Sequence, residues 1–199
     1  MENAARSERS RNAALEAALT IIARDGPRRL TLDAIAQESG ISKGGLLHHF
    51  RTKSAVLKAL LQLQIDYFEA FAQKYREEAD PDQAEPALLE QIAVLREYTA
   101  GRHKIGAALL GIIAEEPGLL SGARGFDIER IERIKAEAAD PDQALLRWSA
   151  ARGLALMTVL GQCPFSEQET QRLFDLLLDE EREPRSLSRH GARSGSGAS

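Results

Sequence analysis

The sequence predicts an all-α protein, in which an N-terminal three-helix domain with a helix-turn-helix precedes a larger helical bundle. Its 199 residues lack the alternation of apolar and polar residues that is typical of strands. They are rich in Ala, Leu, Glu and Arg, which favour helices. Glycine and proline divide the chain into segments of helical length.

A first helix is expected over residues 10–25. Its apolar side chains recur every three or four positions, which gives the helix one buried face, and Gly26-Pro27 stops it. Before it, Arg6, Arg9 and Arg11 have two interpretations that the sequence leaves open. They form a basic arm beside DNA, or they belong to a frayed, solvated N-terminus.

Residues 31–53 carry the most information in the chain. Thr31 is placed to cap a short helix, and Gly40 can adopt the left-handed conformation that ends it. Ser42 is placed to cap a second short helix that carries the apolar Phe50. Two short helices joined by a tight turn form a helix-turn-helix, which places its second helix in the DNA major groove. DNA binding is therefore the leading hypothesis.

The remaining helices follow from apolar periodicity and from glycine and proline stops. We expect them at about 54–79, 86–100, 103–115, 125–138, 142–160 and 166–181. The predicted organisation is a DNA-binding domain at 1–55, a ligand-binding and dimerisation domain at 56–182, and a disordered Ser/Gly/Arg-rich tail at 183–199.

The charge distribution supports this division. The net charge of −4 alone argues against nucleic-acid binding. However, residues 1–55 hold nine Lys/Arg and six Asp/Glu, a net charge of +3, whereas residues 56–182 hold 14 and 23, a net charge of −9. The positive part coincides with the helix-turn-helix, as binding to phosphates requires.

Several features indicate a cytoplasmic protein associated with the nucleoid. No apolar run approaches the length of a membrane span, and the first residues lack the apolar core of a signal peptide. The lone cysteine, Cys163, cannot form an internal disulfide. We expect it to be a buried structural thiol, since no second cysteine is present for a redox sensor.

The stretch 15–61 resembles the N-terminal domain of TetR-type (TetR/AcrR family) transcriptional regulators. The matching motifs are Ala-Leu-x-x-Ile-x-x-x-Gly, Leu-Thr-Leu-Asp-x-Ile-Ala, Ser-Gly-Ile-Ser-Lys-Gly, His-His-Phe and Lys-x-x-x-Leu. The resemblance implies a homodimeric repressor that binds a palindromic operator and is released by a small molecule. The sequence departs from the family at Leu47, where a Tyr often donates its hydroxyl to a phosphate, and leucine cannot donate a hydrogen bond.

Eight residues are candidates for DNA contact. They are Thr31, Ser42, Lys43, Gly44, Gly45, His48, His49 and Lys53. The caps have hydroxyls and free backbone N–H groups for phosphates, or they act as caps alone. Lys43 reaches a guanine edge or a phosphate, or is solvated, and Lys53 is placed for a phosphate.

The glycines and histidines in this set need separate arguments. The Gly44-Gly45 pair is costly within a helix, which indicates either a close approach to base edges or a poorly wound helix start. His48 and His49 point about 100° apart, so one faces DNA while the other packs against the protein. A metal site is not expected there, because no Cys or carboxylate ligands accompany them.

The C-terminal part is expected to hold the effector and the dimer interface. Candidate effector contacts are Phe68, Phe71, Tyr98, His103, Ile112, Phe126, Trp148 and Arg152, although residues at such spacing also form ordinary cores. Candidate dimer contacts are Leu145, Leu146, Ser149, Leu156, Leu160, Leu173, Leu176 and Leu177.

Other classes of function are weighed against this one. No nucleophile elbow, phosphate loop, HExxH motif or paired metal-ligand motif occurs, so we expect neither an enzyme nor a bound cofactor or metal. A DNA-binding protein without an effector remains the alternative. The sequence names neither the effector nor the operator.

Overall fold

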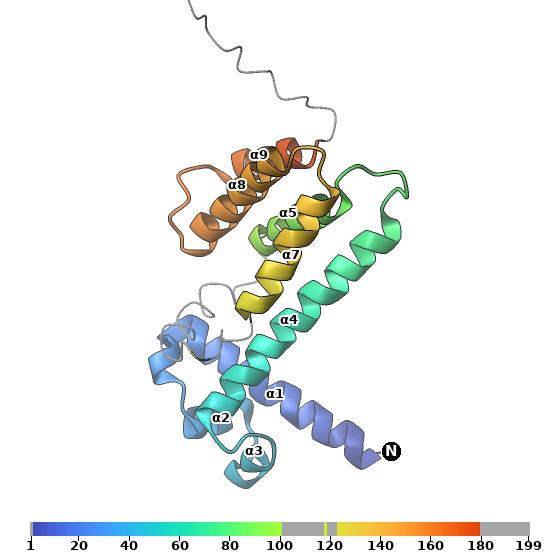
Figure 1. Ribbon diagram of the computed structural model, residues 1–199. Coiled ribbons are helices and arrows are strands. Elements are labelled where there is room, and N and C mark those ends of the chain that lie inside the picture. The colour runs from blue at the N-terminus through green and yellow to red at the C-terminus, as the bar shows by residue number, and fades with distance from the viewer. Residues whose placement is uncertain (1, 101–117, 119–122, 180–199) are drawn as a thin grey trace, which may run out of the picture.

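The computed structural model describes residues 2–100, 118 and 123–179, and these contain helices but no strand. The elements, shown in Figure 1, are α1 (Glu2–Asp25), the 3-10 helix η1 (Pro27–Arg29), α2 (Leu32–Ser39), α3 (Lys43–His49), α4 (Lys53–Glu78), α5 (Pro86–Thr99), α7 (Ala123–Glu137), α8 (Pro141–Val159) and α9 (Glu167–Leu178). The all-α prediction is confirmed. The helix expected at 103–115 and the tail at 183–199 lie outside the described residues.

Helix α1 differs most from its prediction, because it begins at Glu2 and not near residue 10. Residues 4–9 are exposed, so they carry no apolar periodicity that would mark them as helical. They contain neither glycine nor proline, which allows the helix to extend. These residues are helical, and Arg9 Nε donates to the carbonyl of Ala5 one turn earlier, while the basic arm beside DNA stays a prediction.

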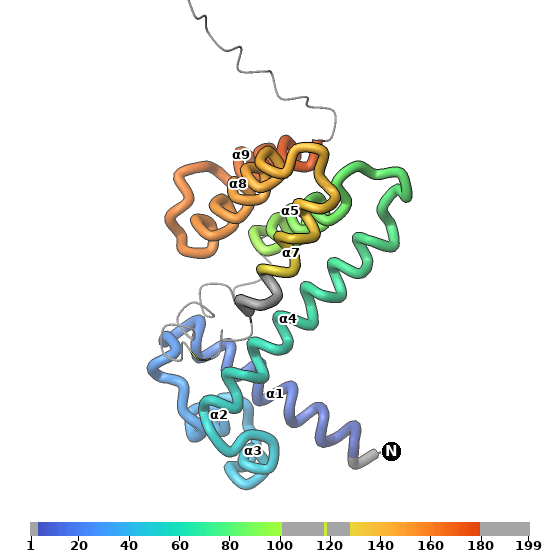
Figure 2. Tube along the Cα trace, viewed as in Figure 1, coloured from blue at the N-terminus to red at the C-terminus, as the bar shows by residue number. Residues whose placement is uncertain are grey.

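The first hydrophobic cluster joins α1, α2, α3 and the start of α4. Leu15, Ile35 and Leu46 are buried there, each no more than 1% exposed. The cluster also includes Val56, Leu57 and Leu60, which lie beyond residue 55, so the core of the N-terminal part extends into α4. Figure 2 shows α4 running from this part to the C-terminal helices as one continuous helix.

The second hydrophobic cluster is made by α5, α7, α8 and α9. Ile92, Ile134 and Phe174 are almost fully buried in it. Glu85 precedes α5 in the left-handed region, at a φ of 51°, a conformation that costs a non-glycine residue about 1 kcal/mol or more. Its carboxylate lies 2.6 Å from Arg147 Nη1 of α8, a contact that offsets part of that cost.

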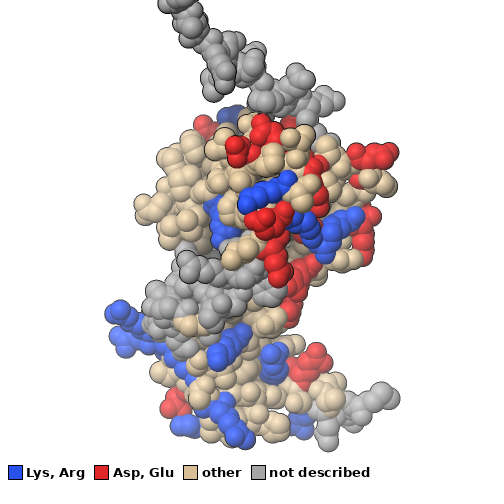
Figure 3. Space-filling view, viewed as in Figure 1, with Lys and Arg blue, Asp and Glu red and all other residues tan. Residues whose placement is uncertain are grey.

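Charge follows the same division of the molecule. Figure 3 shows Lys and Arg side chains over the lower part of the view, where α1–α3 lie, and most Asp and Glu side chains higher up. Among the described residues, no helix is long and apolar enough to span a membrane.

Candidate nucleic-acid interface

Hydroxyl caps fix the helix-turn-helix. Thr31 Oγ1 accepts a hydrogen bond from the backbone N–H of Ala34 at 3.1 Å, and Ser42 Oγ accepts one from Gly45 at 3.2 Å. Gly40 ends α2 at a φ of 69°, the left-handed conformation expected of it. Because each cap uses only an acceptor, the hydroxyl protons of Thr31 and Ser42 stay available for phosphate oxygens.

Helix α3 has one buried and one exposed face. Leu46 and the following Phe50 are buried in the first cluster. The opposite side exposes Lys43, Gly44, Leu47 and His48, which we call the α3 face. Lys43 and Leu47, like Gly44 and His48, are four positions apart, and Gly44 and Leu47 are three apart, so these residues lie on one side of the helix. An exposed second helix is what the major groove requires of a helix-turn-helix.

Lys43 forms an ion pair within the protein. Its Nζ lies 2.7 Å from Oδ1 of Asp33 in the first turn of α2, and both side chains are more than half exposed. Exposed ion pairs contribute about 0–1 kcal/mol. Releasing Lys43 from Asp33 therefore costs little, and its contact with a base edge or phosphate stays a prediction.

The two glycines have different surroundings. A Cβ on Gly44 would meet nothing within 4 Å, so packing in the protein does not require glycine there. A Cβ on Gly45 would lie 3.1 Å from Ile41 Cγ2 and 3.2 Å from Ser42 Oγ, so the turn itself favours glycine. The helix start is regularly wound, since Leu46 N donates to the carbonyl of Ser42. The helix start is thus not poorly wound, and the close approach of Gly44 to base edges stays a prediction.

The two histidines differ in exposure, although their ring centroids lie 5.3 Å apart. His48 is exposed on the α3 face, whereas His49 is half-buried, with its ring 6.3 Å from that of Phe50. Within the described ranges, no group of three or more His, Cys, Asp or Glu is arranged to hold a metal ion.

Lys53, a predicted phosphate contact, is half-buried and donates from Nζ to the carbonyl of Pro27 at 2.7 Å. This bond ties the start of α4 to η1, a structural role that the sequence did not reveal. Phosphate contact by Lys53 stays a prediction. Thr52, the residue before it, caps α4 by accepting from Ala55 N.

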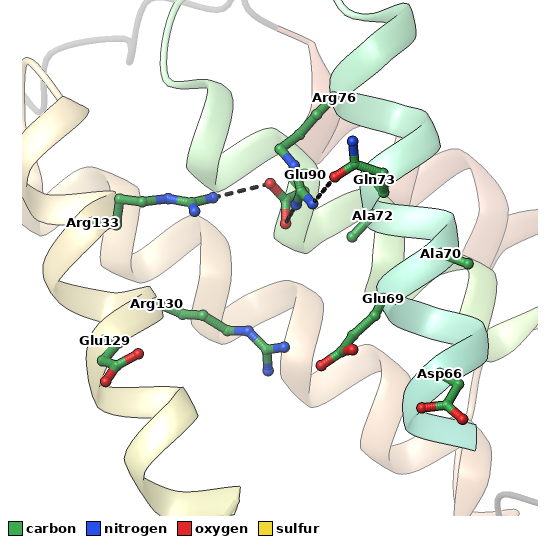
Figure 4. Close-up of a pocket in the computed structure, with 10 residues that line it drawn as sticks. All are labelled: Asp66, Glu69, Ala70, Ala72, Gln73, Arg76, Glu90, Glu129, Arg130 and Arg133. Atoms are coloured by element: carbon green, nitrogen blue, oxygen red, sulfur yellow. Dashed lines mark hydrogen bonds and ion pairs between the residues drawn. The ribbon is translucent and has the colours of Figure 1, made fainter. Parts of the chain in front are cut away.

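A cleft of about 720 Å³ lies between α4, α5 and α7, and we call it the α4–α7 cleft. Its lining is mostly charged: Asp66, Glu69, Ala70, Ala72, Gln73, Arg76, Glu90, Glu129, Arg130 and Arg133. Figure 4 shows Arg76 of α4 and Arg133 of α7 meeting Glu90 of α5 from opposite sides.

Glu90 is the centre of this cleft, with a side chain only 5% exposed. Its two oxygens lie 2.8 Å from Arg76 Nη1 and 3.0 Å from Arg133 Nη2. A buried carboxylate needs such partners to offset its lost hydration. This cluster was not predicted from the sequence, although an acid among the buried apolar residues of α5 was the available signal.

The structure divides the predicted effector contacts. Phe68 and Tyr98 stack with ring centroids 4.3 Å apart between α4 and α5, and burial raises the pKa of Tyr98. Phe71 is half-buried on α4. None of these three is among the residues that line the α4–α7 cleft.

The other predicted effector contacts lie elsewhere. Trp148 packs against the second cluster, and the Arg152 guanidinium lies 5.0 Å from the centre of its ring. His103, Ile112 and the side chain of Phe126 lie outside the described part of the chain.

An apolar surface, the α8–α9 face, covers the two last described helices and the loop between them. Its large exposed residues are Leu146, Leu156, Leu160, Phe165 and Leu176. Of the other predicted dimer contacts, Ser149 is also exposed, Leu145 is half-buried, and Leu173 and Leu177 pack against the second cluster.

Cys163 differs from its expectation, because the residue is only half-buried. The pKa of its thiol is lowered, chiefly by a hydrogen bond from the backbone of Phe165. A buried structural thiol was therefore the wrong expectation. The loop between α8 and α9 keeps this residue at the surface.

The capped helix-turn-helix and the helical body behind it define a DNA-binding regulatory protein. Residues 14–60 match the family model described as bacterial regulatory proteins, tetR family. Residues 87–181 match the model of the tetracyclin repressor-like C-terminal domain. The chain belongs to the TetR family of transcriptional regulators, which is a family of regulators and not of enzymes.

The similar proteins agree with this assignment. The HTH-type transcriptional regulator SrpR of Pseudomonas putida is 37% identical over 60 residues, which span 30% of this chain and 28% of that protein. The match to this curated relative thus covers less than a third of its length.

Similar solved structures share the fold over most of the chain. A TetR-like transcriptional regulator from Rhodococcus sp. RHA1 has a TM-score of 0.62 at 19% identity, covering 85% of this chain and 91% of that one. The fatty acid degradation regulator FadR from Bacillus halodurans has a TM-score of 0.60 at 19% identity, covering 86% and 96%. The multidrug binding protein EbrR complexed with malachite green has a TM-score of 0.59 at 22% identity, covering 85% and 98%.

Proposed function

We propose that this protein is a ligand-responsive repressor that binds a palindromic operator as a homodimer and is released by a small molecule. The α3 face carries the proposal. It exposes Lys43, Gly44 and His48. The caps at Thr31 and Ser42 define where α2 and α3 begin and thereby position this face. Its place of action is the cytoplasm, where it meets the chromosome.

Homodimer formation uses the α8–α9 face. Leu156 on α8 and Leu160 at its C-terminal end are one turn apart and each at least half exposed, and exposed apolar residues that gather in this way mark an interaction site. Two helices from each subunit would bury it as a four-helix interface. Two α3 helices related by the dimer axis would then meet a palindrome, with half-site spacing set by the dimer.

The dimer is tested by sedimentation of Leu156→Glu beside a matched control, Ile128→Glu. Ile128 lies on α7 and is 62% exposed, outside the proposed interface. We expect the Leu156 variant to sediment as a folded monomer and the control to stay a dimer. A dimer in both variants would remove the α8–α9 face from the interface.

Release is proposed to act through α4. This helix contributes Leu60 to the first hydrophobic cluster and Arg76 to the α4–α7 cleft. The DNA-binding part and the proposed effector site are therefore joined by one continuous helix. An effector in the cleft would favour one tilt of α4 and thereby one separation of the two α3 helices. Only the separation that matches the half-site spacing binds the operator well.

The described lining of the cleft supports a polar effector. Arg130, Glu69 and Glu129 line this cleft together with other charged side chains, and such groups suit an effector that forms hydrogen bonds and charge pairs. EbrR has been crystallised with malachite green, ethidium and imidazole. Those ligands show what that protein takes up, and we propose a different, more polar effector for this one.

Selection of bound genomic DNA followed by a mobility-shift assay tests the proposal. Lys43→Ala should weaken binding to the selected operator without changing the fold, because a base or phosphate contact is lost. Lys74→Ala is the control, since this lysine is 71% exposed on the distant part of α4. Failure to enrich any sequence would overturn the proposal, and equal affinity in both variants would remove Lys43 from the interface.

A DNA-binding protein without an effector is the alternative function. The α4–α7 cleft favours the responsive form, because charged side chains from three helices converge on it and can bind a ligand there. Screening the protein–operator complex against charged metabolites distinguishes the two. Release by a compound that fails to release Glu69→Ala would support the cleft as its site.

A further inference from the structure

Leu47 is the one large hydrophobic side chain that residues 4–52 expose. It is 39% exposed, and residues 4–52 include no other exposed large hydrophobic residue. The neighbouring Leu46 is completely buried and fills the core position of α3. Leu47 is therefore not needed for the first hydrophobic cluster, and its exposure asks for another explanation.

Its place on α3 gives that explanation. Leu47 lies four positions after Lys43 and three after Gly44, so the three residues share one side of the helix. The open space at Gly44 lets the backbone approach another surface closely one turn before Leu47. Close approach matters because leucine is short and, unlike lysine, cannot extend across a gap.

The chemistry of the major groove then narrows what Leu47 can recognise. Donors and acceptors line most of the base edges, and the 5-methyl group of thymine is the apolar group among them. Leucine offers no donor or acceptor, and covering a polar base edge with it would leave that edge without a partner. We propose that Leu47 contacts the 5-methyl group of a thymine in each operator half-site and selects thymine at that position.

This inference rests on the proposed operator binding by the α3 face. It assigns a specificity to the position where the resemblance to the family places a tyrosine. A tyrosine hydroxyl there would hold a phosphate, which carries no sequence information. At Leu47 the same position would instead distinguish thymine from the other bases.

A uracil scan of the selected operator tests the inference. Each thymine of the half-site is replaced in turn by uracil, which lacks only the 5-methyl group, symmetrically in both half-sites. Affinities are measured by fluorescence anisotropy for the wild type, Leu47→Ala and Leu47→Met. Leu63→Ala is the matched control, because Leu63 is 44% exposed but lies on α4.

We expect one thymine at which uracil lowers the affinity of the wild type about fourfold per buried methyl group. Leu47→Ala should bind the thymine and uracil operators equally, while Leu47→Met and Leu63→Ala should keep the preference for thymine. Insensitivity of the wild type at every thymine would overturn the inference and leave the proposed function intact. An equal loss in Leu47→Ala would also overturn it, because the methyl group would then be recognised by another residue.

A selection experiment that enriches no operator would be distinguishable from both of these outcomes of the uracil scan. It would contradict the proposed function itself, and the thymine contact with it. Circular dichroism of Leu47→Ala checks the fold, and little change is expected because the side chain is outside the core.

Discussion

The N-terminal and C-terminal parts of this protein are held together by interactions of different range. In the first, Thr31, Ser42 and Thr52 cap helices through N–H groups only three residues away. In the second, the N–H of Ala87 at the start of α5 donates to Glu137 Oε2, 50 residues later in the chain. The body has local caps as well, at Asp140 and Ser166, but it also depends on contacts between residues far apart in the sequence, which no local pattern predicts.

Charge is also used differently in the two parts. Lys43 and Asp33 form an ion pair at the surface, and breaking it to contact DNA costs little free energy. Arg76 and Arg133 instead pair with a buried carboxylate that needs them. Lys43 of the N-terminal part can thus exchange its partner, while the two arginines of the body join helices around a cleft.

The largest expected effect comes from the buried charge. In Arg76→Ala/Arg133→Ala, Glu90 stays buried without either partner, which should lower the free energy of unfolding by about 3 kcal/mol or more. The chain has one tryptophan, Trp148, and it lies in the body, so its fluorescence in urea reports on that part.

Two comparisons sharpen this prediction. Adding Glu90→Gln should recover part of the loss, because a neutral amide is cheaper to bury than a charge. Lys74→Ala, at an exposed ion pair on the same helix, should change stability little. A double arginine variant as stable as the wild type would show that the body does not depend on this cluster.

Gly44→Ala should separate stability from binding in the N-terminal part. Alanine is favoured over glycine within a helix by about 1 kcal/mol, and nothing lies within 4 Å of the added Cβ, so the free protein should become more stable. Operator affinity should fall about tenfold, because the new methyl group holds α3 away from the bases. Urea unfolding and mobility shifts measure the two effects.

Gly45→Ala is the matched comparison for that variant. Its added Cβ would lie 3.1 Å from Ile41, so the gain in stability should be absent. If Gly44→Ala binds the operator as tightly as the wild type, the α3 backbone does not approach DNA closely at this residue.

Asp33→Asn should have a smaller effect, in the opposite direction. Without the carboxylate, Lys43 no longer exchanges an ion pair for DNA, so affinity should rise by about twofold to fivefold. The rise should shrink at high salt, which screens exposed pairs. A fall in affinity would show instead that Asp33 holds Lys43 in its binding position.

The smallest expected effect is the pH response of the α9 cap. Hydrogen bonds from Ser166 lower the pKa of Glu169 below its ordinary 4.5, so the ionised form favours the folded state. This stabilisation is complete above the ordinary pKa and is lost as pH falls through the lowered one. Melting temperatures of Glu169→Gln should therefore fall less on acidification than those of the wild type or of Glu167→Gln, a change in the same turn.

The comparison also explains which predictions succeeded. The positions of α2 and α3 could be predicted because Thr31 and Ser42 mark where they begin and Gly40 marks where α2 ends. The start of α1 was missed because its first turns are exposed and pack against nothing that would impose a period. Apolar spacing marked α5 as a helix, but could not show that its Glu90 meets arginines from α4 and α7.

The candidate interface was partly predictable for the same reason. Lys43, Gly44 and His48 lie on the face that helical periodicity assigns to them. Two contacts join separate elements: the hydrogen bond from Lys53 to Pro27 and the ion pair of Lys43 with Asp33. No local sequence pattern predicts such contacts.

The central claim is that the α3 face recognises bases and does not merely attract DNA. The most direct test is selection from random DNA by the wild type, Lys43→Ala and the control Lys74→Ala at the same salt concentration. We predict that Lys43→Ala loses the preference at one symmetric base pair, while the rest of the motif is kept and the control selects the full motif. An unchanged motif bound more weakly by Lys43→Ala would contradict the claim for Lys43 and make it a phosphate contact.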